Sequence, residues 1–259
     1  MSGGPVGVQR PPFEVAETVT LSGPPGYDLD RVARSHAGAG LRPYAYDGRR
    51  LTTVLPSGTL ARVDQALRVE LSAPDPVGLQ VLRQVLDLDA DLTELWACAD
   101  PWVRETGAGR HLRASSVLEA LAQALASTNT SYRGTQAMME QLVGDGPFPL
   151  PEQVPGRPLT TWGYRGPALL GAARAVHEGL DEGWPDASDE QVLSAVRAQR
   201  GFGPFAAASV LPLLGRPRPL VLDKWLAQQL PDPGRYARYG RWAGTVLWLE
   251  VTRTWFPDV

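Results

Sequence analysis

The segment of residues 193–226 constrains the fold most, because a Gly-x-Gly break joins two helix-like stretches there. The first stretch is amphipathic and ends at Gly201-Phe202-Gly203-Pro204, and the second is apolar and rich in alanine. Glycine allows a tight turn and the close approach of a ligand to the backbone, and proline suits the first position of a helix. The second helix would direct unpaired N–H groups and its positive dipole end outward. We therefore expect a helical hairpin whose backbone can hold a DNA phosphate without reading the base sequence.

One carboxylate follows the hairpin at a defined distance. Asp223 lies 20 residues after Gly203, in the otherwise apolar run Leu-Val-Leu-Asp-Lys-Trp. An acid in such a run commonly caps the N-terminus of a helix. A carboxylate beside a nucleic acid can also stabilise a cationic, oxocarbenium-like sugar and orient or deprotonate an attacking water. The two uses are compatible, and the spacing from the hairpin favours the catalytic one.

Composition narrows the class of protein. The chain has 259 residues, of which 43% are hydrophobic and 20% charged, as in ordinary soluble globular proteins. No apolar run reaches the ~18 residues of a membrane span, and residues 1–15 lack the apolar core of a secretion signal, so we expect no membrane partner. The single cysteine, Cys98, excludes an internal disulfide and a four-cysteine iron–sulfur cluster. Three scattered histidines (His36, His111 and His177) show no metal-ligand spacing, so no metal site is expected.

Charge is distributed unevenly along the chain. The net charge of −3 weighs against a DNA-binding protein. Residues 190–259, however, hold eight Arg and one Lys against five acids, a net charge of +4, which leaves −7 for the rest of the chain. Such a basic region can still meet a phosphate backbone, although ordinary solvated charge explains it equally well. Lys224 is the only lysine, so an amine nucleophile must be Lys224 or the N-terminus.

The local patterns predict a mostly α protein with a small N-terminal antiparallel β-sheet, an α+β fold. Residues 1–12 form a tail, residues 13–72 a sheet subdomain and residues 73–259 a helical body. The alternating pattern predicts strands at 15–21, 41–46, 50–55, 59–63 and 66–71, with a short helix at 27–36. Helical patterns cover 77–85, 92–98, 101–106, 115–126, 135–143, 167–178, 189–200, 204–214, 222–229 and 239–255.

The hairpin and Asp223 together resemble the helix-hairpin-helix (HhH-GPD) DNA glycosylase superfamily, and above all its bacterial 3-methyladenine and 8-oxoguanine branches, which lack an iron–sulfur cluster. The segments Gly109-Arg110-His111-Leu112-Arg113 and Leu118-Glu119-Ala120-Leu121 are similar to the entry into the family's central helix. Residues 235–255 resemble the terminal helix of the 3-methyladenine branch. The resemblance spans residues 107–256.

The resemblance implies roles for several residues. Asp223 would be the essential carboxylate. Backbone groups would grip the DNA at the hairpin residues Gly201, Phe202, Gly203, Phe205 and Ala206. Asn129 would fill the gap that an extruded base leaves in the duplex; a loop that merely ends the helix is the alternative interpretation of this polar run. The Trp162-Gly163-Tyr164-Arg165 turn and the terminal helix add aromatics that either contact the base or pack in the core: Trp162, Tyr164, Phe205, Trp225 and Trp242 are the pocket candidates.

The resemblance also predicts the reaction. Family members with lyase activity carry a lysine two residues after the second hairpin glycine, where this chain has Phe205, so we expect a monofunctional glycosylase that excises a damaged, alkylated purine in base excision repair. The substrate would be a flipped-out base of double-stranded DNA, and the enzyme a cytoplasmic, nucleoid-associated monomer without cofactor, apart from a monovalent cation that the hairpin carbonyls could hold. An 8-oxoguanine glycosylase, suggested by Asn129, and a non-catalytic DNA-binding protein are the alternatives.

Overall fold

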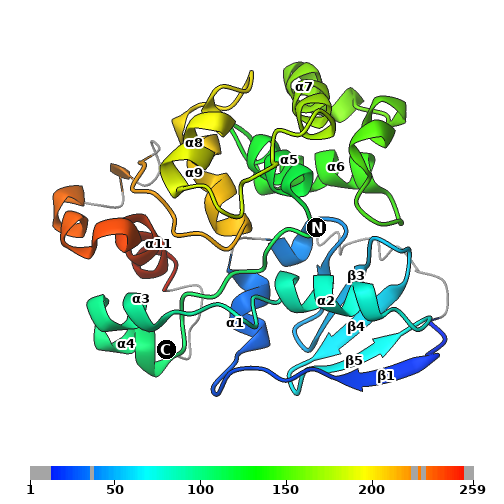
Figure 1. Cartoon of the computed structure of the whole chain (residues 1–259), viewed down its shortest axis with the longest axis horizontal. Coiled ribbons are helices and arrows are strands. Elements are labelled where there is room, and N and C mark those ends of the chain that lie inside the picture. Colours follow the sequence, from blue (N-terminus) through cyan, green and yellow to red (C-terminus); the bar gives the residue numbers. More distant parts are fainter. Residues whose placement is uncertain (1–12, 36–37, 223–226, 229–231, 254–259) are drawn as a thin grey trace, which may run out of the picture.

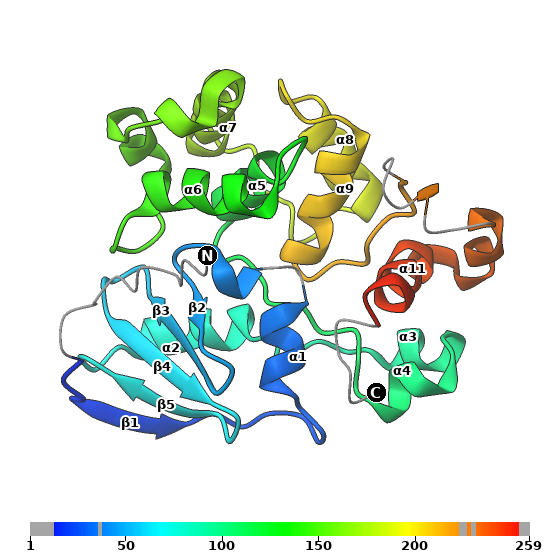
Figure 2. The same cartoon turned by 180° about the vertical axis from the view of Figure 1, so that it is seen from behind.

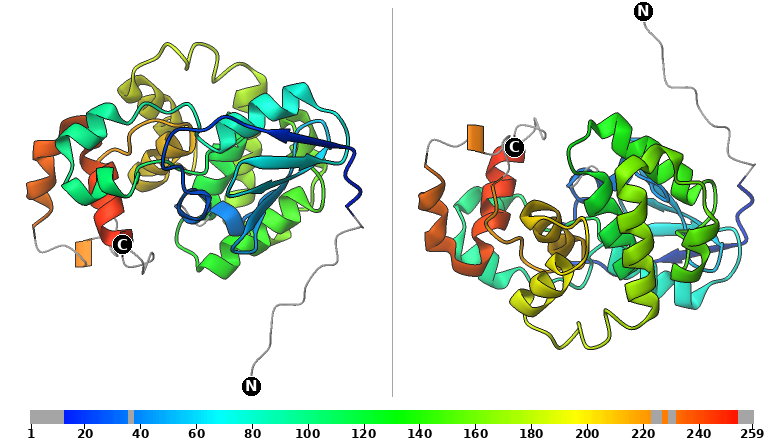
Figure 3. Two further views of the ribbon diagram at one scale, coloured as in Figure 1. Left: turned by 90° about the horizontal axis from the view of Figure 1, so that it is seen from below. Right: turned by 90° about the horizontal axis from the view of Figure 1, so that it is seen from above.

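The computed structural model describes residues 13–35, 38–222, 227–228 and 232–253. A sheet subdomain lies at one corner of the molecule, and the helices α5 to α9 lie above it (Figure 1). The helices α3, α4 and α11 form a third group at the side (Figure 1, Figure 3). The predicted class, mostly helical with a small antiparallel sheet, is confirmed.

The sheet is antiparallel throughout, with the strand order β1-β5-β4-β3-β2. On the face of the sheet that points to the core, a row of apolar residues crosses β3, β4 and β5. Leu51 pairs with Val63, and Val63 pairs with Val69. None of the three has exposed surface. The helices α1 and α2 bury their apolar sides against this face. The bounds are β1 Glu17–Thr20, α1 Leu29–Arg34, η1 (a 3₁₀ helix) Gly38–Gly40, β2 Ala45–Tyr46, β3 Arg50–Val54, β4 Leu60–Asp64, β5 Arg68–Leu71 and α2 Pro76–Val85.

The helix α5 (Val117–Ala126) is the centre of the helical part. Ser116 caps it by accepting the N–H of Glu119. Every residue from Leu118 to Ala126 is buried, because α6, α7 and α9 surround the helix. The other bounds are α6 Tyr132–Val143, η2 Pro151–Gly156, η3 Thr160–Arg165, α7 Gly166–His177, α8 Asp189–Arg197 and α9 Pro204–Leu213, where η denotes a 3₁₀ helix.

A third core joins two segments that lie far apart in the sequence. The helices α3 (Thr93–Cys98) and α4 (Pro101–Glu105) pack against the 3₁₀ helix η4 (Pro233–Trp242) and α11 (Ala243–Thr252). The predicted helix at 239–255 is wrong at its start, because Gly240 has a φ of 55° and breaks the chain into η4 and α11. The predicted helix at 222–229 lies largely outside the described residues.

Within the described part of the chain, no helix combines the length and the apolar character needed to cross a membrane.

Candidate functional site

The predicted helical hairpin is present between α8 and α9, and its two glycines have different structural roles. Gly201 has a φ of 91°, and a Cβ there would lie 2.7 Å from the Cβ of Ala168 on α7. Gly203 has an ordinary φ of −70° and forms the N-cap of α9, followed by Pro204 at the first helical position. A Cβ on Gly203 would have no atom of the described residues within 4 Å. Gly201 is therefore needed for the fold of the turn, whereas Gly203 leaves the backbone open to a ligand.

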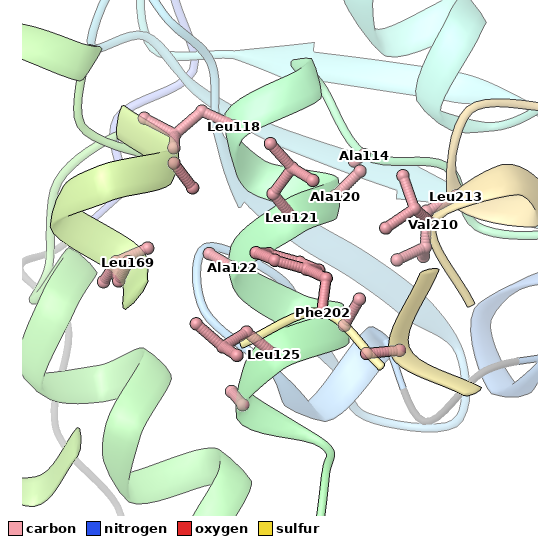
Figure 4. Close-up of a cluster of buried hydrophobic side chains, with 14 of the residues drawn as sticks. Ala114, Leu118, Ala120, Leu121, Ala122, Leu125, Leu169, Phe202, Val210 and Leu213 are labelled. Carbon is pink, nitrogen blue, oxygen red and sulfur yellow. The ribbon is translucent and has the colours of Figure 1, made fainter. Parts of the chain in front are cut away.

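Phe202, between the two glycines, points inward. It is 4% exposed and packs with Leu121 and Leu125 of α5 in the helical core (Figure 4). The ring therefore anchors the hairpin on the central helix, and any contact from this residue to a ligand must come from its backbone.

The N-terminus of α9 is the part of the hairpin suited to an anion. Among the described residues no side chain caps this end, and the first intrahelical bond runs from the N–H of Ala207 to the carbonyl of Gly203. The N–H groups of Phe205 and Ala206 fall in the first turn, where a helix provides no carbonyl partner. Together with the dipole, they make a site for a phosphate or carboxylate.

The loop of residues 127–131, between α5 and α6, carries Asn129. This residue has a φ of 46° and is exposed. Asparagine adopts this left-handed conformation more readily than most residues. In the described part of the chain the Asn129 side chain makes no hydrogen bond, whereas its carbonyl oxygen accepts one from Arg165. Its side chain is thus presented to the outside by a loop whose backbone is held.

The turn before α7 contributes an aromatic and an arginine. Gly163 has φ 52° and ψ −128°, which reverses the chain between Trp162 and Tyr164. Tyr164 is 72% exposed, whereas Arg165 is 7% exposed and its guanidinium carbon lies 4.4 Å from the centroid of the Tyr164 ring. The guanidinium donates to the carbonyl oxygens of Thr128 and Asn129.

These three segments meet in one pocket of about 300 Å³. The loop that leaves α5 reaches towards the start of α9 in Figure 2. The lining residues are Leu125, Ser127, Thr128, Asn129, Tyr164, Arg165, Ala168, Gly201, Gly203, Pro204, Phe205 and Ala206. The structure therefore brings together Asn129, Tyr164, Phe205 and the hairpin backbone, all of which sequence reasoning named from separate motifs.

Two of the predicted pocket aromatics lie elsewhere. Trp162 has no exposed surface, packs in the helical core and donates from Nε1 to the carbonyl oxygen of Met138 at 2.9 Å. Packing, the alternative use of such a ring, is what the structure gives Trp162. Trp242 is 8% exposed and belongs to the third core, beneath the guanidinium of Arg241. Asp223 and Trp225 lie outside the described residues.

Sequence reasoning missed a buried cation beside the hairpin. Arg218 is 4% exposed, and its guanidinium carbon lies 5.8 Å from the Phe205 ring centroid and 4.6 Å from that of Trp248. The same guanidinium donates to the hydroxyl of Ser209 on α9. Burial, and then the charge of Arg218, lowers the pKa of His111 to about 4. No sequence signal marked this arginine, because its partners come from α9 and α11.

A larger hollow of about 760 Å³ lies at the opposite end of α8 and α9, lined in part by Asp189, Leu214 and Arg216. Of the predicted site residues that the structure describes, none lines this hollow. Arg216 is engaged there with Asp189 at 2.7 Å and with the carbonyl oxygens of Ala187 and Trp184. The described residues hold no cluster of three or more His, Cys, Asp or Glu side chains placed to bind a metal ion.

The fold is that of the helix-hairpin-helix DNA glycosylases, as comparison with solved structures shows. MBOgg1, solved with a low-affinity DNA ligand, matches with a TM-score of 0.69 and 18% identity over 92% of this chain and 96% of its own. The 8-oxoguanine glycosylase/lyase of Clostridium acetobutylicum matches with a TM-score of 0.68 and 14% identity, covering 87% and 92% of the two chains. The 3-methyladenine DNA glycosylase of Archaeoglobus fulgidus matches with a TM-score of 0.65 and 17% identity, covering 94% and 100%. No protein-family model and no curated protein matches the sequence.

Proposed function

We propose that this chain is a monofunctional DNA glycosylase of base excision repair, which hydrolyses the N-glycosidic bond of a flipped-out, damaged purine. The observation that carries the proposal is the 300 Å³ pocket where the Asn129 loop, the Tyr164–Arg165 turn and the open end of α9 meet. The glycosylase fold supports the same reading, and structural relatives act on 8-oxoguanine or 3-methyladenine, by their names.

In this proposal each part of the pocket has a separate task. The N–H groups of Phe205 and Ala206 hold a backbone phosphate, helped by the dipole of α9. Asn129 enters the duplex and occupies the gap that the extruded base leaves, while extrusion itself costs a few kcal/mol. The protein binds double-stranded DNA as a monomer in the cytoplasm, at the nucleoid, and a monovalent cation at the hairpin carbonyls remains part of the proposal.

Asp223 supplies the chemistry. Its carboxylate stabilises the positive charge that develops on the sugar and orients or deprotonates the attacking water. The bond between the sugar carbon and the base nitrogen breaks, water adds at that carbon, and the base leaves with its electron pair. Phe205 occupies the position of the lysine on which lyase activity depends in related enzymes, so no Schiff base forms there and the abasic site stays intact.

An alkylated purine is the proposed substrate. Tyr164, which is 72% exposed, and Phe205 both line the pocket, and an electron-poor, alkylated base gains from stacking on an electron-rich ring. An 8-oxoguanine glycosylase is the second candidate, favoured by Asn129 and by the MBOgg1 and Clostridium acetobutylicum structures. A non-catalytic DNA-binding protein is the third.

Base release from a panel of duplexes tests the proposal. The duplexes carry 3-methyladenine, 7-methylguanine, 1,N6-ethenoadenine, hypoxanthine, uracil or 8-oxoguanine, and the proteins are wild type, Asp223→Asn and Asp232→Asn. We expect wild type to release an alkylated purine, Asp223→Asn to lose at least about a hundredfold in rate, and both to bind DNA alike. Asp232, an exposed cap of η4, is the matched control for the charge change.

Three outcomes redirect the proposal. Release of 8-oxoguanine alone selects the second candidate. Trapping of a covalent adduct by borohydride contradicts the monofunctional mechanism. DNA binding without release from any lesion selects the binding protein.

A further inference from the structure

We propose that Arg165 is a positioning residue, which holds the 127–131 loop in the shape that lets Asn129 enter the duplex. The inference rests on the proposed function, because it explains what holds Asn129, the residue proposed to fill the gap in the duplex. Arg165 comes from the turn before α7 and is 7% exposed, yet its guanidinium reaches across to the carbonyl oxygens of Thr128 and Asn129, the latter at 3.1 Å.

The loop needs this support at one place in particular. Side-chain hydroxyls hold the end of α5, since Ser127 donates to the carbonyl of Ala124, Thr128 to that of Leu125 and Thr135 to that of Ala126. None of these donors reaches the carbonyls of Thr128 and Asn129. Among the hydrogen bonds of the described residues, those from Arg165 are the ones that hold the carbonyls of Thr128 and Asn129.

The arginine is itself fixed. Its guanidinium stacks on the Tyr164 ring at 4.4 Å, and it lies beside the C-terminal end of α5, where a positive charge is favourable. The left-handed backbone of Asn129, with a φ of 46°, is thus held in a conformation that a free loop would visit only part of the time. A loop ordered before binding does not lose that freedom when it enters DNA.

The geometry also explains why the residue is arginine. One terminal nitrogen, Nη2, donates to both carbonyl oxygens, and the planar guanidinium also stacks on the Tyr164 ring. The lysine ammonium is a compact, strongly hydrated point charge that cannot stack in this way. Arg165→Lys therefore keeps the charge and removes the planar, stacked donor.

A comparison of duplex with single-stranded substrate tests the role. A single strand leaves no gap for Asn129 to fill, so the loop matters only on duplex DNA. We expect Arg165→Lys to lower single-turnover base release from a duplex lesion by about tenfold to a hundredfold, the worth of charge-assisted hydrogen bonds. Release from the same lesion in a single strand should fall by a clearly smaller factor than release from the duplex. Arg174→Lys, on the exposed side of α7, is the control and should change neither.

Asn129→Gly completes a double-mutant cycle without backbone strain, because glycine accepts the positive φ. If Arg165 acts through Asn129, the double variant should lose no more on duplex DNA than the more impaired single variant. Equal losses on duplex and single strand, or additive losses, would show a merely structural role and overturn the inference.

A second readout does not require catalysis. The fluorescence of 2-aminopurine placed at the lesion position rises when that base leaves the stack, and Arg165→Lys should reduce the rise when it is measured at saturating protein concentration. An unchanged rise overturns the inference. Wild type that raises the fluorescence but releases no base would instead count against the proposed catalysis alone.

Discussion

Replacing either hairpin glycine with alanine adds one methyl group, but the two replacements should affect different properties of the protein. Gly201→Ala forces an alanine into a φ of 91° and places its Cβ 2.7 Å from the Cβ of Ala168. Gly203→Ala keeps an ordinary φ of −70° and puts the methyl where no atom lies within 4 Å. Gly203 also lines the 300 Å³ pocket. The first change therefore acts on folding and the second on binding.

The magnitudes follow from these contacts. The left-handed backbone costs an alanine about 1–2 kcal/mol, and overpacking adds about 1–3 kcal/mol, so Gly201→Ala should lower the free energy of unfolding by roughly 2–5 kcal/mol. For a chain of this size this is a fall in Tm of roughly 5–15 °C. Gly203→Ala should change the free energy of unfolding by less than about 1 kcal/mol. Its methyl group should still keep a phosphate from the N–H groups of α9, at a cost near tenfold in affinity.

Thermal melts and DNA titrations at fixed salt measure both effects. Gly171→Ala is the control, because Gly171 lies inside α7 with open space around its Cβ position and alanine favours a helix. The reasoning is refuted if Gly203→Ala melts as low as Gly201→Ala. It is equally refuted if Gly203→Ala binds DNA as tightly as wild type.

Two further predictions concern buried groups. Burial raises the pKa of Glu119 from 4.5 to about 7, against hydrogen bonds from Ser115, and burial followed by the charge of Arg218 lowers the pKa of His111 from 6.5 to about 4. Between pH 4.5 and 6.5 the folded state thus holds an extra proton at Glu119 and lacks one at His111, so the contributions of these two groups to the pH dependence of stability have opposite signs and nearly cancel. Relative to wild type, Glu119→Gln should gain stability as the pH rises, by on the order of 2 kcal/mol in denaturant titrations. A difference from wild type that stays constant with pH would contradict the assignment. Trp162→Phe should lower the free energy of unfolding by about 1–3 kcal/mol, through its lost hydrogen bond and smaller ring, and a changed order of preference among lesions would show that this ring contacts the base after all.

Local patterns predicted much of the fold because the governing interactions lie within a few residues. The period-two pattern located the strands, although the strand predicted at 41–46 is formed only at Ala45–Tyr46, and Ser116 caps α5 near the start of the helix predicted at 115–126. Prediction failed where a helix begins inside a polar run. The pattern predicts that the helix starts at Thr135, but α6 begins at Tyr132, and Ser131 caps it by accepting the N–H of Gly134. A polar run that resembles a loop can thus also contain a good cap.

The candidate site was predictable in part. The hairpin, Asn129 and Tyr164 each stand in a recognisable motif, and the structure places them around one pocket. The buried position of Arg218 was not predictable, because its neighbours Phe205 and Trp248 come from α9 and α11, and the packing of α9 against α11 leaves no pattern in the sequence. Arginine side chains are mostly exposed in folded proteins, so an arginine in a sequence is by default expected at the surface.

A comparison of two turns explains why the aromatic residues could not be assigned from their motifs. Gly163 and Gly240 have nearly the same dihedral angles, φ 52°, ψ −128° and φ 55°, ψ −127°. In each case the next helix begins three residues after the glycine. In both turns the residue after the glycine is exposed and the next one is buried. At the first turn the order is Tyr-Arg, so the ring faces the pocket and the arginine holds the neighbouring loop. At the second the order is Arg-Trp, so the tryptophan enters the core and the arginine faces solvent. The order of two residues after a glycine, rather than the presence of an aromatic, therefore decides which of these turns offers a ring to a ligand.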